Sequence, residues 1–143
     1  MEGSNFVDRT YKKPNELSEN EKKLLSLSKL VKGDGFTQYV YFKGKRIGRI
    51  SLRGAHADNL QSVYEMEIKP EYRNKGIGKE IYRRVNQELN KQGKVLTSEF
   101  GGITSTEAKQ MWKSLVRSGE AEIIIDDLTD RGVPIRYKFK DPK

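Results

Sequence analysis

The stretch Met66-Glu67-Ile68-Lys69-Pro70-Glu71-Tyr72-Arg73-Asn74-Lys75-Gly76-Ile77-Gly78-Lys79 joins the end of one predicted strand to the start of one predicted helix. Pro70 ends the strand, because proline cannot donate a hydrogen bond to a sheet. Gly76 and Gly78 have no side chain to keep a ligand away from the backbone. Since the first amides of a helix are unpaired and carry partial positive charge, the stretch predicts a phosphate-binding turn.

An amphipathic helix follows the turn. Its apolar residues recur every four positions, at Ile77, Ile81, Val85 and Leu89, with polar and charged residues between them. Residues 62–68 before the turn, and Val95 to Glu99 after the helix, are typical of strands. A strand–helix–strand unit of this kind predicts a right-handed parallel crossover.

The N-terminal part of the chain predicts one helix, with a short edge strand over residues 5–10. Ser18-Glu19-Asn20-Glu21 has the pattern of a capping box, in which Ser18 and Glu21 bond each other's backbone amides. Apolar residues at helical spacing follow: Leu24, Leu27, Leu30 and Val31. We expect this helix to end at the glycines of residues 33–35.

The remaining elements complete a mixed sheet. Residues 36–42 and 46–52 alternate around Lys43-Gly44-Lys45 and predict a hairpin. A further helix has its apolar stripe at Ala108, Met111, Trp112 and Leu115, and residues 121–125 and 135–139 predict two last strands. The predicted class is α/β (α+β), with a mostly antiparallel sheet, a central β-α-β crossover and helices on both faces. We expect one domain over residues 1–143.

Composition narrows the chemistry. The 143-residue chain has no cysteine and one histidine, His56, so we expect no disulfide, no metal site and no histidine-based triad. It has no apolar run of membrane-spanning length, and residues 1–5 lack the features of a secretory signal, so we expect a cytoplasmic protein that does not enter membranes. The net charge of +8 favours an anionic partner.

The turn resembles motif A of the GNAT superfamily, the acetyl-CoA-dependent N-acetyltransferases. The family signature is Arg or Gln, two residues, Gly, one residue, then Gly or Ala, and it is complete here from Arg73 to Gly78. The order of elements is similar over residues 18–139, with one N-terminal helix where many members have two. The chain also resembles small GNAT-like proteins of bacteriophages, which would place it in the host cytoplasm. A Walker site and a Rossmann fingerprint are excluded, because the residues that they require are missing.

The resemblance implies a cofactor and its contacts. The cosubstrate would be acetyl-CoA, with its pyrophosphate on the amides of residues 74–79 and its pantetheine arm paired with the backbone of residues 66–68. The cofactor-binding residues would be Met66, Glu67, Ile68, Arg73, Asn74, Lys75, Gly76, Ile77, Gly78 and Lys79.

The resemblance also locates the usual acid. Many members carry an acidic tyrosine on the helix that follows the fifth strand, in the pattern Asn, two residues, Ala, three residues, Tyr. The matching positions here are Ser105, Ala108 and Trp112. An indole N–H only donates a hydrogen bond, so Trp112 cannot replace the acid, and we interpret it as a core aromatic residue. Ser105 keeps a hydroxyl and stays a candidate.

Other groups could act as base or acid. Glu99 is the first candidate base, because it ends a strand where two parallel strands are expected to separate. Glu65 or Glu67 could instead act as base through water, although a surface ion pair accounts for them better. Tyr64, Tyr72 and Tyr137 are alternative acids, and Tyr72 is expected to pack at the turn.

Three functions follow from these observations. The first is transfer of acetyl from acetyl-CoA to an amine of a protein or a small molecule. The second is a catalytically inactive GNAT-fold protein that binds coenzyme A with a regulatory or structural role. The third is nucleic-acid binding through Tyr39, Tyr41 and Arg46. The acidic residues of the 126–134 loop favour a cationic acceptor, but the basic surface favours an acidic one, so the acceptor stays open.

Overall fold

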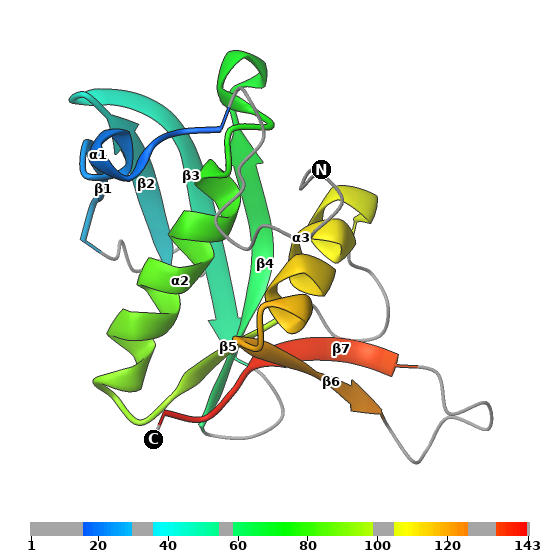
Figure 1. Cartoon of the computed structure of the whole chain (residues 1–143). Helices are drawn as coiled ribbons and strands as arrows, with labels where there is room; N and C mark the ends of the chain where they lie inside the picture. The colour runs from blue at the N-terminus through cyan, green and yellow to red at the C-terminus, as the bar shows by residue number, and fades with distance from the viewer. Residues whose placement is uncertain (1–15, 30–35, 55–58, 99–104, 126–133, 143) are drawn as a thin grey trace, which may run out of the picture.

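The computed structural model describes residues 16–29, 36–54, 59–98, 105–125 and 134–142. Figure 1 shows the arrangement of the helices and strands. In chain order they are α1 (Glu19–Lys22), β1 (Leu25–Leu27), β2 (Thr37–Phe42), β3 (Lys45–Gly54), β4 (Leu60–Ile68), the 3-10 helix η1 (Pro70–Tyr72), α2 (Ile77–Asn90), β5 (Val95–Thr97), α3 (Thr106–Arg117), β6 (Ala121–Ile125) and β7 (Pro134–Phe139).

The described strands form one sheet in the order β1-β2-β3-β4-β5-β7-β6. All neighbouring pairs are antiparallel except β4 and β5, which are parallel and joined through α2. Figure 1 shows α2 lying across the strands of the N-terminal half of the sheet. The predicted fold class is therefore confirmed, including the hairpin of β2 and β3 and the parallel crossover.

The parallel pair β4 and β5 separates soon after it begins. Its paired residues are Leu60 with Val95, Gln61 with Leu96 and Ser62 with Thr97. Beyond that point β5 reaches β7, where Thr97 lies opposite Lys138. β4 continues to Ile68, paired only with β3 among the described strands. The second half of β4 thus has one edge that no described strand occupies.

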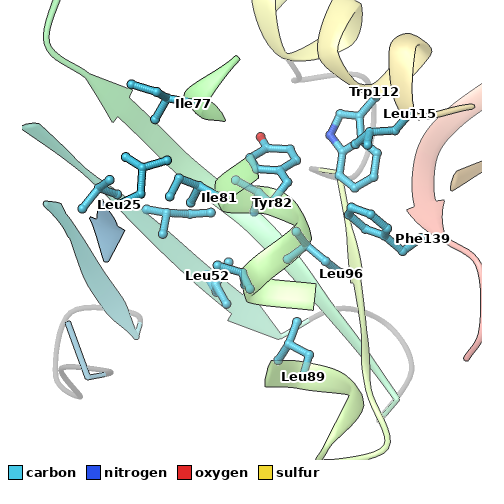
Figure 2. Close-up of a cluster of buried hydrophobic side chains, with 14 of the residues drawn as sticks. Leu25, Leu52, Ile77, Ile81, Tyr82, Leu89, Leu96, Trp112, Leu115 and Phe139 are labelled. Atoms are coloured by element: carbon cyan, nitrogen blue, oxygen red, sulfur yellow. The ribbon is translucent and has the colours of Figure 1, made fainter. Parts of the chain in front are cut away.

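The core lies between α2, α3 and the sheet, and Figure 2 shows part of it. The predicted stripe of α2 is buried at Ile77, Ile81, Val85 and Leu89. On α3, Trp112 and Leu115 are fully buried. The side-chain oxygen of Asn86 accepts a hydrogen bond from the Leu96 amide at 2.9 Å and ties α2 to β5.

The N-terminal helix is shorter than predicted. The capping box at Ser18 and Glu21 is confirmed, but the helix ends at Lys22. Leu25 to Leu27 instead form β1, which pairs with β2. Because this pairing buries Leu25 and leaves Leu24 exposed, the helical spacing of the leucines was misleading. The predicted edge strand and the predicted helix end at residues 33–35 lie outside the described residues.

The side chain of Arg84 holds the chain where it passes from α1 into β1. From α2 it donates to the carbonyl oxygens of Lys22 at 2.5 Å and of Leu25 at 2.6 Å. These bonds satisfy carbonyls that a longer helix would have used itself. None of the helices in the described ranges has the length and apolar character needed to cross a bilayer.

Candidate functional site

The turn after β4 leaves the start of α2 open. Gly76, the residue before the helix, has φ 78°, and no side chain caps the first amides. Asn74 is also left-handed, with φ 62°. The Arg73 Nε donates to the Ile68 carbonyl oxygen at 2.8 Å, so this side chain holds the turn against the end of β4. An uncapped helix start of this geometry can hold an anion.

The two glycines of the motif are also packed against other segments. A Cβ at Gly78 would stand 3.1 Å from the sulfur of Met111, so glycine lets α3 approach α2. A Cβ at Gly76 would stand 2.8 Å from the Glu16 Cγ and 3.3 Å from its Oε1. The Leu17 amide donates to the Lys75 carbonyl oxygen at 2.9 Å, which anchors this segment on the turn. The Glu16 carboxylate therefore lies beside the turn that is expected to hold an anion.

A cleft of about 990 Å³ runs from this turn along β4. Its walls are the open half of β4, the turn with the first residues of α2, and the inner side of α3. The predicted cofactor-binding residues and candidate acids or bases that line it are Tyr64, Glu65, Met66, Glu67, Ile68, Tyr72, Arg73, Asn74, Gly76, Ile77, Gly78, Lys79 and Ser105. Lys75 is not among the lining residues, but its carbonyl oxygen holds Leu17.

The carboxylates of β4 are paired across the sheet. Arg49 of β3 contacts both, with Nη2 at 3.1 Å from Glu65 Oε1 and Nε at 3.1 Å from Glu67 Oε1. Both acids are well exposed to solvent on this side. The ion-pair interpretation of Glu65 and Glu67 is thus confirmed, while the proposed role of Glu65 as base stays a prediction. Exposed pairs of this kind add little stability.

The other catalytic candidates differ in their positions and contacts. Ser105 is the N-cap of α3, and its Oγ accepts from the Ala108 amide at 3.2 Å. Its hydroxyl therefore has a capping role in addition to lining the cleft. Glu99 and His56 lie outside the described residues. Tyr72 packs edge-on against Phe42 at a centroid distance of 6.1 Å, as expected for a residue at the turn.

Lys79 is half-buried in the cleft wall, and its Nζ donates to the Ser114 Oγ of α3 at 2.8 Å. Desolvation lowers the pKa of Lys79 below its ordinary value, and the positive charge of Arg83 lowers it further. Glu16 and Glu120 act in the opposite direction. Lys79 therefore brings a cation to the turn and links α2 to α3.

Trp112 is a core residue, as the sequence predicted. It is 0% exposed and packs among Tyr82, Tyr137 and Phe139, with centroid distances of 5.2, 6.1 and 5.5 Å. Its indole nitrogen is buried without a hydrogen-bond partner. Tyr82, which also lines the cleft, was not predicted, because it stands one position away from the apolar stripe of α2.

The features that suggested other functions have local explanations. The Arg46 guanidinium lies 3.7 Å from the centre of the Tyr39 ring, so the aromatic and basic groups of that strand face contact each other. Among the described residues, no group of three or more His, Asp or Glu side chains could hold a metal ion.

Comparison with known proteins identifies the fold. An IAA acetyltransferase from Bacillus cereus matches with 17% identity and a TM-score of 0.52, covering 74% of this chain and 77% of its own. A Bacillus subtilis acetyltransferase solved with CoA matches with 13% identity and a TM-score of 0.53, covering 74% and 76%. The ribosomal-protein-S18-alanine N-acetyltransferase from Escherichia coli matches with 15% identity and a TM-score of 0.53, covering 78% and 73%.

The sequence identities of these matches are low, so the matches show a similar fold and nothing more. No protein-family model matches the sequence, and no curated protein matches it.

Proposed function

Because the chain has the fold of the GNAT N-acetyltransferases, we propose that it binds acetyl-CoA and transfers the acetyl group to an amine of a protein or a small molecule. The observation that carries the proposal is the cleft, which joins an uncapped helix start to the open edge of β4. A phosphate group and a strand-like chain are the two parts that such a cleft accommodates.

The proposed binding mode uses backbone groups. The amides at the start of α2, from Gly76 to Lys79, would hold the pyrophosphate, and Lys79 would add positive charge beside it. The edge of β4 at residues 66–68 would pair with the amides of the pantetheine arm, as an added strand does. The CoA complex of the Bacillus subtilis neighbour agrees with a ligand of this class.

Transfer of the acetyl group to an amine has three chemical requirements. The amine must lose its proton before its nitrogen bonds the thioester carbon, the developing oxyanion needs a donor, and the thiolate takes a proton as the carbon–sulfur bond breaks. Glu65, which lines the cleft on the open half of β4, would accept the amine proton through water. Glu99 and Ser105 stay the further candidates for this chemistry.

Calorimetry with acetyl-CoA tests the binding step. We expect Gly76→Glu to weaken binding on the order of 100-fold, because the new side chain fills the turn and repels the pyrophosphate. Gly93→Glu is the matched control, since Gly93 is also left-handed (φ 75°) but has open space around it and lies outside the cleft. If the unchanged protein fails to bind acetyl-CoA at tens of micromolar, the proposal is wrong.

A second function, coenzyme A binding without catalysis, is favoured by one observation: the helix position of the usual acid is taken by the buried Trp112. Release of the coenzyme thiol with a panel of amines separates the two functions. Thiol release that requires an added amine supports the transferase. Binding of acetyl-CoA without thiol release for any amine supports the second function.

A further inference from the structure

A second hollow, of about 610 Å³, lies beside the cleft where the start of β3, the end of β4 and η1 meet. It shares Glu67, Ile68 and Arg73 with the cleft. Met66 and Ile68, which flank Glu67 on β4, pack against the core. Because successive side chains of a strand point to opposite faces, the Glu67 side of the hollow lies on the face of the sheet away from α2.

Four cationic side chains and one carboxylate line this basic hollow: Arg46, Arg49, Lys69, Arg73 and Glu67. Arg49 is paired with Glu67 at 3.1 Å. Among the described residues, no carboxylate forms an ion pair with Arg46, Lys69 or Arg73. Like charges that gather without a counter-charge repel one another, so this arrangement favours an anionic ligand.

The two arginines without an ion pair are held in place by contacts that leave N–H donors for a ligand. The Arg46 guanidinium lies 3.7 Å from the centre of the Tyr39 ring, which orients the group without using its N–H donors. The Arg73 Nε donates to the Ile68 carbonyl oxygen, which leaves both Nη groups. Oriented guanidinium groups match the oxygens of a phosphate group. A phosphate monoester, with close to two negative charges at neutral pH, also suits three cations better than a single carboxylate does.

Arg49 connects the basic hollow to the open half of β4. Its Nε contacts Glu67 while its Nη2 lies 3.1 Å from Glu65 Oε1. Glu65 is the residue that would accept the amine proton in the proposed transfer, and it precedes Glu67 and Lys69 on the same stretch of chain. At a rise of roughly 3.3 Å per residue, Glu65 is about 7 Å from Glu67 and about 13 Å from Lys69 along the strand direction.

We propose that the acceptor of the acetyl group is an amine that carries a phosphate group, with the phosphate in the basic hollow and the amine at Glu65. The inference rests on the proposed function and names the class of acceptor that this function leaves open. The amine nitrogen and the phosphorus of such an acceptor are about 7–13 Å apart, the span from Glu65 to the hollow. Arg46, Lys69 and the outer N–H groups of Arg73 hold the phosphate, while the cosubstrate pyrophosphate stays on the amides of the turn.

A matched pair of ligands tests the binding of the phosphate. Calorimetry on the protein saturated with CoA compares aminohexyl phosphate, whose extended chain fits this span, with aminohexanol, which has the same amine and carbon chain. We expect the phosphate to bind about tenfold more tightly, with a smaller difference at high salt, because salt screens exposed charges. Equal affinities in a protein that binds CoA would overturn the inference and leave the proposed function standing. If CoA does not bind, both are overturned.

Two variants locate the phosphate. Arg46→Gln and Lys69→Gln each remove one cation of the basic hollow, and all three positions changed in this test are exposed, so the variants should fold. Each should weaken binding of aminohexyl phosphate about fivefold and change binding of aminohexanol and CoA less than about twofold. Lys109→Gln removes a cation of α3 outside both the cleft and the hollow and is the matched control. Unchanged binding of the phosphate in both hollow variants would show that it binds elsewhere and would refute the inference.

Thiol release from acetyl-CoA gives a test with a kinetic readout. The kcat/KM for aminohexyl phosphate should exceed that for aminohexanol about tenfold, and aminoethyl phosphate, which is too short for the span, should lose this advantage. Arg46→Gln should raise the KM for aminohexyl phosphate with little change in kcat, because Arg46 binds a part of the acceptor that does not react. Thiol release that is equally fast with both aminohexyl compounds, or absent with both, would overturn the inference, whereas calorimetry with acetyl-CoA still decides whether the protein binds the cosubstrate.

Discussion

The two ends of the cleft are built in different ways. The turn end comes from one continuous stretch, Arg73 to Lys79, and offers backbone amides and positive charge. The aromatic end comes from α2, α3 and β7, which bring Tyr82, Trp112, Tyr137 and Phe139 together. The turn end would hold the part of the cosubstrate that is common to every acyl-CoA. The difference teaches that the turn is encoded locally in the sequence, whereas the aromatic end depends on tertiary contacts.

The largest expected effect comes from breaking the aromatic end. Trp112→Ala removes the fully buried indole on which Tyr82, Tyr137 and Phe139 pack, and should lower the free energy of unfolding by about 3–5 kcal/mol. Denaturant unfolding measures this loss. A change below about 1 kcal/mol would show that the aromatic cluster does not hold α3 against the sheet.

A smaller loss of stability is expected at Gly48, where β3 packs closely against β4, the strand that lines the cleft. A Cβ at Gly48 would overlap the Glu67 carbonyl oxygen and come within 2.9 Å of the Ile68 Cδ1. Gly48→Ala should therefore destabilise the protein by about 1–3 kcal/mol and displace β4. Gly54→Ala, on the same strand with nothing near its Cβ, is the control. Equal stability of the two variants would contradict this expectation.

The link between α2 and the turn that follows α3 should depend on pH. The Arg83 Nε and Nη2 donate to Glu120 at 2.6 and 2.8 Å. The hydrogen bond from Arg83 lowers the pKa of Glu120, with help from Ser118, while burial opposes the shift. A lowered folded-state pKa contributes stability above the unfolded value near 4.5, and that contribution is lost as the pH falls through the folded-state pKa.

Glu120→Gln should accordingly lower the melting temperature by about 3 °C at pH 7, as expected for a loss of roughly 1 kcal/mol. The difference from the unchanged protein should shrink as the pH falls below 4.5. Glu88→Gln breaks an exposed pair with Lys91 and should change the melting temperature very little. A Glu120→Gln difference that persists at pH 3 would argue against the charge-based explanation.

The smallest expected effect is a gain in acetyl-CoA affinity at the turn end. The Glu16 carboxylate lies beside Gly76, so it should repel a pyrophosphate there. Glu16→Gln should tighten acetyl-CoA binding about twofold to fivefold, with a smaller gain at high salt. Glu71→Gln, which removes a carboxylate outside the cleft, is the control for calorimetry. Weaker binding by Glu16→Gln would mean that the carboxylate supports the turn.

Local patterns in the sequence predicted most of the fold. The four-residue spacing of Ile77, Ile81 and Val85 predicted α2, and the alternation around Gly44 predicted the hairpin. The N-terminal helix was predicted too long, because the pairing of Leu25–Leu27 with β2 depends on residues far away in the sequence. Propensity and spacing carry no information about such a partner.

The candidate site likewise has one part that the sequence predicted and another part that it could not predict. The residues of the turn were predicted from their own sequence, and the structure brings nearly all of them to one cleft. Three contacts could not be predicted, because each joins segments that are distant in sequence. They are the pairing of Glu65 with Arg49, the position of Glu16 beside Gly76, and the meeting of Tyr82 with Trp112.

The separation of β4 from β5 has a consequence for solubility. An unpaired strand edge at the margin of a sheet can pair with strands of other molecules, and this pairing leads to aggregation. Here the open edge of β4 lies inside the sheet order, with β5, β7 and β6 beyond it, and α3 forms the opposite wall of the cleft. A whole sheet from a neighbouring molecule would have to pass these elements, whereas a slender chain with amide groups can enter lengthwise. The fold thus keeps a strand edge available to a thin ligand while shielding it from other copies of the protein.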